Sequence, residues 1–247
     1  MDFSLVIPAY NEEHYLPRLL DTIDIARQRY RGGADAIEII VGDNASTDRT
    51  AEIAAERGCR VVRVEKRCIG AARNGGAAVA QGDILCFSDA DYRIHPETFN
   101  VIKDGIDSGK YVAGATGVKL ERISVGIFAA YCLMVPMVWL MRMDTGVVFC
   151  RREDFESIGG YNEERLFAED VQFLFDMRRL GKPRGQRLGR LTKAKVLTST
   201  RKFDIHGDWH YVWLVLVAPL YFTVLRKQID EFAQRYWYNE RREAPKP

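Results

Sequence analysis

Four short apolar runs rich in β-branched residues recur in the first half of this 247-residue chain, and helix-like segments separate them. The runs cover residues 4–8, 37–42, 60–64 and 83–88. Strands that are apolar on both faces and that alternate with helices are typical of a parallel sheet covered by helices on both sides. The pattern therefore predicts an α/β fold built on a mostly parallel, Rossmann-like central sheet.

The helices between the runs carry boundary signals. Ser46 or Thr47 can cap the second helix, and Gly58 can end it because glycine accepts the left-handed conformation. Segments with helical periodicity or strand-like composition continue along the whole chain. Helices are expected at about 12–30, 47–57, 69–80 and 168–180, and a short helix followed by a glycine turn at 152–164. Later strands are expected at 111–120, 145–151 and 196–203.

Composition is that of a globular protein, with 47% hydrophobic and 28% charged residues. The net charge of +2 produces no overall field that would attract nucleic acid. The five cysteines are an odd number without a CxxC motif, so neither a zinc site nor a disulfide framework is expected. A reduced, cytoplasmic setting is expected instead. The N-terminal stretch MDFSLVIPAYNEE lacks the basic start and long apolar stretch of a signal peptide.

Acidic turns follow three of the four expected strands. AYNEE follows the first, GDNASTD the second and SDAD the fourth. Because ligands of open α/β sheets bind beyond the carboxyl ends of the strands, these turns are expected to lie along one edge of the sheet. Three such turns indicate a site that binds a hard cation or a polar ligand.

Asp89 and Asp91 lie one residue apart, directly after the apolar run 84–87. Two like charges at the end of a buried strand repel each other and lose solvation unless a positive group lies between them. A divalent cation such as Mg²⁺ takes carboxylate oxygens together with substrate phosphates, and would remove that repulsion. The alternative is that both residues serve in the turn or at the start of the helix after His95 and Pro96.

Other charged residues allow two interpretations each. Arg73 lies in CIGAARNGG, and its planar guanidinium could bind the diphosphate or the base of a nucleotide. The alternative is that it is an arginine on the surface of a helix. Glu169 and Asp170 are expected to begin a helix. One interpretation is that they complement the helix dipole, and the other is that one of them is a general base. The glycines match neither GxGxxG after the first strand nor the P-loop pattern, which argues against a nicotinamide enzyme and a P-loop kinase.

Six motifs in order, SLVIPAYNEE, GDNASTDRT, IGAARNGG, ILCFSDAD, FCRREDFESIGGYNE and AEDVQF, resemble those of the family-2 glycosyltransferases. These are inverting enzymes of the GT-A fold, and the resemblance covers about residues 3–175. It implies a GT-A domain over 1–205, with a nucleotide-binding half at about 1–95 and an acceptor half at about 96–205. The remaining residues, 206–247, are expected to form a C-terminal apolar helical segment and a charged tail.

The resemblance also implies roles for single residues. In the family's acidic helix-start motif the aspartate is usually the base, so Asp170 is the first catalytic candidate and Glu169 the second. Asp91 and Asp89 match the DxD metal pair for Mg²⁺ or Mn²⁺, and His206 is a candidate further ligand. Donor-binding roles are implied for Pro8, Tyr10, Glu12, Asp43, Arg73 and Asp89, and acceptor-binding roles for Gly159, Gly160 and Tyr161.

The implied activity is a single displacement that moves a sugar from a nucleotide donor to a glycan or lipid-linked acceptor. Arg201 and Lys202 are candidates for contact with the diphosphate. A sugar nucleotidyltransferase is one rival, although PAYNEE is a poor substitute for its glycine-rich loop. A sugar-nucleotide binding module without catalysis is another, although both Asp91 and Asp170 are retained.

Two apolar runs stand outside the sheet pattern, at 123–141 and 209–225. The first has nineteen residues without a charge, near the length that spans a bilayer, but Pro136 interrupts it. It also connects two expected core strands, which must stay on one side of a membrane. We expect helices that lie on the domain or in a membrane interface at the inner face of the membrane, with a buried helix or a homodimer contact as alternatives. The tryptophans at 139, 209, 213 and 237 are the candidate interface anchors.

Overall fold

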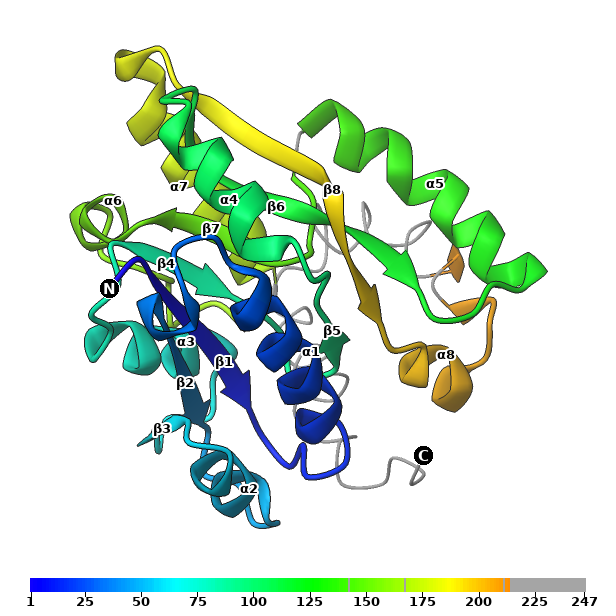
Figure 1. Cartoon of the computed structure of the whole chain (residues 1–247). Helices are drawn as coiled ribbons and strands as arrows, with labels where there is room; N and C mark the ends of the chain where they lie inside the picture. The colour runs from blue at the N-terminus through cyan, green and yellow to red at the C-terminus, as the bar shows by residue number, and fades with distance from the viewer. Residues whose placement is uncertain (142, 167, 211, 214–247) are drawn as a thin grey trace.

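The structure is a computed structural model that describes residues 1–141, 143–166, 168–210 and 212–213. One eight-stranded sheet runs through it in the order β3-β2-β1-β4-β7-β6-β8-β5 (Figure 1). The strands are β1 (Phe3–Ala9), β2 (Ile37–Asp43), β3 (Arg60–Arg63), β4 (Ile84–Phe87), β5 (Tyr92–Arg93), β6 (Tyr111–Leu120), β7 (Val148–Arg151) and β8 (Arg187–Thr198).

The pairing of the strands divides the sheet into two halves. β1 pairs in parallel with both β2 and β4, and β2 pairs in parallel with β3, as the first-half pattern predicts. β7 then runs antiparallel between β4 and β6, whereas β6 and β8 are again parallel. The sheet is therefore mixed, with a parallel half that ends at the acidic turns.

Helices cover both faces of this sheet. They are α1 (Leu16–Arg29), α2 (Thr50–Glu56), α3 (Ile69–Ala78), α4 (Thr98–Asp107), α5 (Val125–Met141), α6 (Arg152–Ser157), α7 (Glu169–Gly181) and α8 (Arg201–His206). One apolar cluster joins α1, α2 and α4 to one face of the sheet, and a second joins α3, α6 and α7 to the other. Alternate residues of β1 supply both, since Leu5 belongs to the first cluster and Val6 to the second.

Aromatic rings fill the second cluster. Phe87 at the end of β4 packs edge-on against Tyr161, with the ring centroids 5.1 Å apart. Tyr161 stacks on Phe173 of α7 at 4.3 Å, and Phe155 of α6 lies 5.8 Å from Phe173. Such pairs add to the free energy gained from burying their area. The cluster anchors the first turn of α7 close to the end of β4.

Two local expectations were wrong. The last strand was expected at 196–203, but β8 starts at Arg187 and ends at Thr198, and α8 begins at Arg201. α2 begins at Thr50 rather than after a cap at Ser46 or Thr47.

Hydrogen bonds explain the shifted start of α2. The Oγ of Ser46 accepts a bond from the backbone N–H of Asn11, and the backbone N–H of Thr47 donates to the side chain of Asn11. Both residues thus tie their loop to the turn after β1. The side chain of Asp48 instead accepts a bond from the backbone N–H of Thr50 at 2.9 Å.

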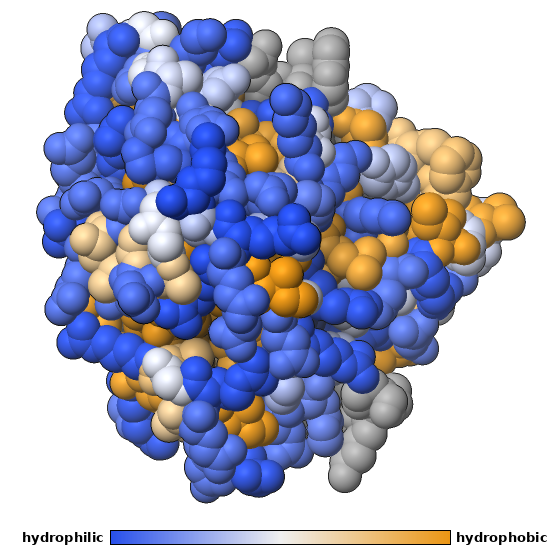
Figure 2. All heavy atoms as spheres, in the orientation of Figure 1, coloured by the Kyte–Doolittle hydropathy of each residue, from blue (hydrophilic) through white to orange (hydrophobic). Residues whose placement is uncertain are grey.

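The apolar run 123–141 forms α5, a helix of 17 residues that contains Pro136. Figure 2 shows apolar side chains gathered at the end of the molecule where α5 lies in Figure 1. Within the part of the chain that the structure describes, none of the helices combines the length and apolarity needed to cross a membrane. Most of the second run, 209–225, and all of the tail, 226–247, lie outside the described residues, as does Trp237.

Candidate functional site

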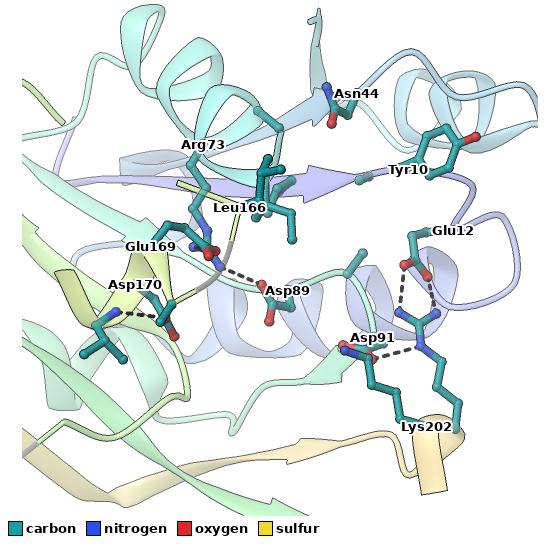
Figure 3. A pocket seen from close by; sticks show the side chains of 18 residues that line it. Tyr10, Glu12, Asn44, Arg73, Asp89, Asp91, Leu166, Glu169, Asp170 and Lys202 are labelled. Atoms are coloured by element: carbon teal, nitrogen blue, oxygen red, sulfur yellow. Dashed lines mark hydrogen bonds and ion pairs between the residues drawn. The ribbon is translucent and has the colours of Figure 1, made fainter. Parts of the chain in front are cut away.

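A cavity of about 300 Å³ opens at the carboxyl ends of β1 and β4. The turn after β1, the turn after β4, helix α3 and the first turns of α7 and α8 all contribute side chains to it (Figure 3). It therefore joins both halves of the chain at the edge of the sheet where acidic turns were expected. Of the residues singled out in the sequence, its lining contains Pro8, Tyr10, Glu12, Arg73, Asp89, Asp91, Glu169, Asp170, Arg201 and Lys202.

Arg73 is buried at the back of this cavity and bridges two acids. Its Nη1 donates to Glu169 at 2.9 Å and its Nη2 to Asp89 at 3.0 Å. Its guanidinium also lies 4.9 Å from the centre of the Tyr161 ring. Burial lowers the pKa of Arg73, but Tyr161, Glu169 and Asp89 raise it by more, so the guanidinium stays charged. The α3 arginine therefore fixes the positions of two candidate site acids.

Glu169 and Asp170 are neighbours with different environments. The side chain of Glu169 is 10% exposed, and this burial raises its pKa. The positive charge of Arg73 lowers that pKa in part, and the negative charge of Asp170 raises it further. The carboxylate of Asp170 lines the cavity and accepts a bond from the backbone N–H of Val171 at 2.8 Å. The backbone of Ala168, just before them, is left-handed at φ 53°, which turns the chain sharply into α7. The geometry thus leaves Asp170 as the carboxylate available to a ligand.

Arg201 extends from the start of α8 to the opposite side of the cavity. Its two terminal nitrogens donate to the two oxygens of Glu12, each at 2.8 Å, and its Nε lies 3.3 Å from Asp91 (dashed lines in Figure 3). Burial lowers the pKa of Arg201, but Asp91 and Glu12 raise it by more. A single guanidinium therefore connects the first acidic turn to the third.

Tyr10 borders the cavity beside the end of β2. The guanidinium of Arg67 lies over its ring, 3.5 Å from the ring centre. Asp43, a candidate donor-binding residue, is 1% exposed and accepts a bond from the backbone N–H of Ser46. It does not line the cavity, whereas the next residue, Asn44, does.

Asn44 is a residue that the sequence did not single out. Its side-chain amide donates to the carbonyls of Val64 and Lys66, at 3.0 and 2.7 Å, and so holds the loop after β3 beside the cavity. Its place directly after an expected strand was the only available signal. Leu166 in the loop before α7 also lines the cavity, and no sequence pattern marked it.

The glycine turn does not reach this cavity. Gly159 and Gly160 have positive φ angles of 77° and 74°, and Tyr161 is 2% exposed inside the aromatic cluster. The Tyr161 backbone N–H donates to Asn74 of α3 at 2.9 Å. The structure therefore places Tyr161 behind Arg73 rather than at the cavity surface.

Asp89 and Asp91 carry the oxygen ligands that Mg²⁺ and Mn²⁺ prefer, and both face the cavity. His206 does not line this cavity, and its ring stacks on that of His210 with the centroids 4.7 Å apart. Among the described residues, no group of three or more histidine, cysteine or acidic side chains is arranged to hold a metal ion. The two aspartates fit a hard cation by their chemistry, at a position where Asp91 is now paired with Arg201.

The sequence model of the family described as Glycosyl transferase family 2 matches residues 4–123. A 4,4'-diaponeurosporenoate glycosyltransferase from Staphylococcus haemolyticus is 40% identical over 101 residues, 38% of this chain and 25% of that protein. An undecaprenyl-phosphate 4-deoxy-4-formamido-L-arabinose transferase from Pseudomonas paraeruginosa is 40% identical over 119 residues, 45% of this chain and 34% of that protein. The chain thus matches only a quarter to a third of the length of these relatives.

Solved structures extend the likeness to most of the fold. Residues 1–349 of TarS from S. aureus superpose with a TM-score of 0.62 at 20% identity, covering 88% of this chain and 66% of that one. Glucosyl-3-phosphoglycerate synthase from Mycobacterium tuberculosis gives 0.60 at 22% identity, covering 88% and 79%. The fold is that of the GT-A glycosyltransferases. Over its N-terminal segment, residues 4–123, the chain is similar to glycosyl transferase family 2.

Proposed function

We propose that this chain transfers a sugar from a nucleotide-sugar donor to an acceptor hydroxyl or phosphate, with inversion at the anomeric carbon. The observation that carries the proposal is that Asp89, Asp91 and Asp170 line one cavity, although Asp91 and Asp170 are 79 positions apart in the chain. A DxD pair and a carboxylate facing the same space are what a single displacement on a nucleotide sugar requires.

Asp170 is assigned the role of base. In the step, an acceptor oxygen forms a bond to the anomeric carbon as the bond from that carbon to the diphosphate oxygen breaks. The nucleotide diphosphate leaves with the bonding electrons, and the proton of an acceptor hydroxyl goes to Asp170. An acceptor phosphate oxygen carries no proton to remove, and Asp170 would then orient it.

Glu169 and Arg73 act as positioning residues. Arg73 ties Glu169 to Asp89, so the helix that carries Asp170 is connected to the turn that carries the DxD pair. A Mg²⁺ or Mn²⁺ ion would be held by Asp91 with Asp89, and would supply positive charge against the charge that develops on the leaving diphosphate. Arg201 and Lys202 lie at the same side of the cavity and can contact the diphosphate oxygens.

The relatives support both the donor and the cation. TarS 1–349 has been solved in complex with UDP and with UDP-GlcNAc. Glucosyl-3-phosphoglycerate synthase has been solved with Mn²⁺ and UDP-glucose. Curated relatives include a dolichol-phosphate mannosyltransferase, which supports a lipid-linked acceptor, and a poly(ribitol-phosphate) N-acetylglucosaminyltransferase, which supports a glycan-like one.

Residues 1–205 are proposed to form the transferase domain. The same proposal includes contact between this domain and a membrane surface through α5. Its support is the exposure of apolar side chains on that helix, since Val125 and Phe128 are 77% and 58% exposed.

The test is a panel of UDP-, GDP- and dTDP-sugars, assayed with and without Mn²⁺ for binding and for release of the nucleoside diphosphate. Asp91→Ala and Asp170→Asn should lower the rate at least about 100-fold with the preferred donor. Asp176→Asn is the matched control, since Asp176 lies on the same helix as Asp170 but outside the cavity. Unchanged rates in both site variants would refute the assignment.

The same assay separates the rivals. A sugar nucleotidyltransferase would form a sugar nucleotide and diphosphate from a nucleoside triphosphate and a sugar phosphate. A binding module would bind the donor without turnover.

A further inference from the structure

A second cavity, of about 330 Å³, adjoins the first and shares Asp89, Asp91 and Lys202 with it. Residues of β6, β8 and helix α5 line it, and none of its lining residues belongs to β1. Its volume lies at the lower end of the range for small-molecule sites. Because the two cavities meet at the DxD pair, a molecule in the second would present its inner end to a sugar nucleotide bound in the first.

One wall of the second cavity is apolar. Helix α5 contributes Ile127, Ala130, Tyr131 and Val135, and its sequence VGIFAAYCLMVPMVWLM contains no charged residue. Ile127 is 1% exposed, whereas Tyr131 is 46% exposed at the rim. The wall therefore continues from the buried interior to the apolar outer surface of the helix.

That outer surface is unusually apolar for a protein exterior. Phe128 and Leu133 on the same helix are 58% and 44% exposed, and Ile123 just before it is 71% exposed. Figure 2 shows apolar spheres gathered at the end of the molecule where α5 lies in Figure 1. An apolar chain that leaves the cavity along α5 would stay in contact with apolar atoms, whereas a glycan would lose water there without gaining hydrogen bonds.

The opposite wall is charged, and its acids are already paired. Asp144 forms two hydrogen bonds with Arg190 of β8. Asp89 and Asp91 are paired with the arginines of the first cavity. Lys195 of β8 also lines the wall, and no carboxylate among the described residues pairs with it.

The stem of Lys195 lies where a side chain at position 117 would be. A Cβ added to Gly117 would come within 3.0 Å of the Lys195 Cγ, so the glycine makes room for the lysine. With Lys202 at the border of the two cavities, an anion that enters meets lysines rather than unpaired carboxylates.

We propose that the second cavity is the acceptor site and that it takes an amphiphile, with a phosphate head beside Lys195 and Lys202 and an apolar chain along α5. This inference rests on the proposed function, because it assigns the acceptor of that same transfer. It predicts that neither the phosphate nor the chain alone is sufficient for binding.

The test measures binding to the full chain by calorimetry with decyl phosphate below its micelle concentration, and with decanol and glycerol 1-phosphate as its two halves. Decyl phosphate should bind at least about tenfold more tightly than either half. Lys195→Gln should weaken decyl phosphate binding about tenfold, and added salt should reduce the difference. Tyr131→Ser should weaken it through the loss of apolar contact.

Two matched variants control for general effects of charge and apolarity. Lys193 is exposed on β8 two residues before Lys195, and Ile25 is exposed on α1, away from α5, but neither lines the cavity. Lys193→Gln and Ile25→Ser should bind decyl phosphate as the wild type does. If Lys193→Gln weakens binding as much as Lys195→Gln, or if glycerol 1-phosphate binds as tightly as decyl phosphate, the inference is wrong.

The donor assay distinguishes this failure from failure of the proposed function. Sugar-nucleotide turnover without specific decyl phosphate binding would overturn the acceptor assignment alone. Specific decyl phosphate binding by a chain that turns over no sugar nucleotide would overturn the proposed function, and with it the role of the cavity as an acceptor site.

Discussion

Arg201 and Glu12 are 189 residues apart in the sequence and form a two-pronged ion pair, with both nitrogen–oxygen distances at 2.8 Å. Their side chains are 14% and 2% exposed. The same guanidinium reaches Asp91, whose side chain is 16% exposed. Carboxylates so far removed from water need a positive partner. In this structure the partner is the arginine, at a place where a divalent cation would compete for Asp91.

Arg201→Ala is expected to lower the free energy of unfolding by about 3 kcal/mol, because it leaves buried carboxylates without their cation. Mn²⁺ should then recover part of that loss, since an ion that binds only the folded state stabilises it. The measurement is the melting temperature of wild type and variant with and without Mn²⁺. The rise caused by Mn²⁺ should be larger in Arg201→Ala.

Arg201→Lys keeps the charge and should respond to Mn²⁺ as the wild type does. Arg57→Ala removes an arginine that pairs with Asp21 and Asp24 on the surface of α1, and controls for the loss of an arginine as such. An equal rise in melting temperature for Arg201→Ala and Arg57→Ala would show that Arg201 and the ion do not compete.

Arg73 and Glu169 should be strongly coupled in stability. Arg73→Met removes the cation from two acids and is expected to cost about 3–5 kcal/mol. Glu169→Gln removes one of those acids, so the double variant should lose clearly less than the sum of the single losses. Urea unfolding of the wild type and the three variants measures the coupling.

The exposed pair Arg63 and Glu65 is the control cycle, since its side chains are 61% and 75% exposed and no measurable coupling is expected. Additivity of Arg73→Met and Glu169→Gln within about 0.5 kcal/mol would contradict the buried bridge.

The parallel half of the sheet could be predicted because its strands are short, apolar on both faces and separated by regular helices. β8 could be predicted only from residue 196, because its first part, RLGRLTKAK, is rich in basic residues and resembles a loop. The antiparallel direction of β7 could not be predicted from its residues, because a buried strand has a similar composition whether it runs parallel or antiparallel to its neighbours.

The acidic half of the site could be predicted because carboxylates after strands lie at one edge of the sheet. Its basic half could not be placed, although Arg73 and Arg201 were candidates. Nothing near Arg201 indicates that it pairs with Glu12 rather than with solvent, since the contact depends on the fold of the whole domain. From the sequence, a metal ion was therefore the predicted partner of the two DxD carboxylates. The arginines that pair with them lie far away in the sequence, so these ion pairs could not be predicted.

Gly160 and Gly159 should differ in their tolerance of a side chain. Both have positive φ angles, at which alanine is strained by about 1–2 kcal/mol. A Cβ on Gly160 would also lie 2.7 Å from the Asn74 side-chain oxygen and 2.9 Å from Phe155, whereas nothing lies within 4 Å of one on Gly159.

Gly160→Ala should therefore lose about 1–3 kcal/mol more than Gly159→Ala in urea unfolding. Because neither glycine lines a described cavity, the Michaelis constant for the acceptor should stay the same in both variants. Equal losses of stability would contradict the packing around Gly160, and a raised Michaelis constant would favour the acceptor contact that the family resemblance implies.

The cysteines should react with iodoacetamide in an order set by burial and pKa. Cys132 on α5 is exposed and should be alkylated first. Burial raises the pKa of Cys59 to about 11, so little of it is thiolate at pH 8. Because the thiolate is the nucleophile, its alkylation rate should rise about tenfold for each pH unit between 7.5 and 9.5. Cys86 and Cys150 lie in the core of the sheet, where burial raises their pKa further, and should stay unmodified while the fold is intact.

Mass spectrometry of peptides after timed alkylation gives the rate at each cysteine, and denatured protein gives the rate without burial. Cys59 reacting as fast as Cys132 at pH 8 would place it at the surface, against the packing of β3 on the sheet. Rapid modification of Cys86 or Cys150 at any pH in this range would mean that β4 and β7 separate in solution, and the DxD turn, which follows β4 directly, could not then be held in place by that pairing.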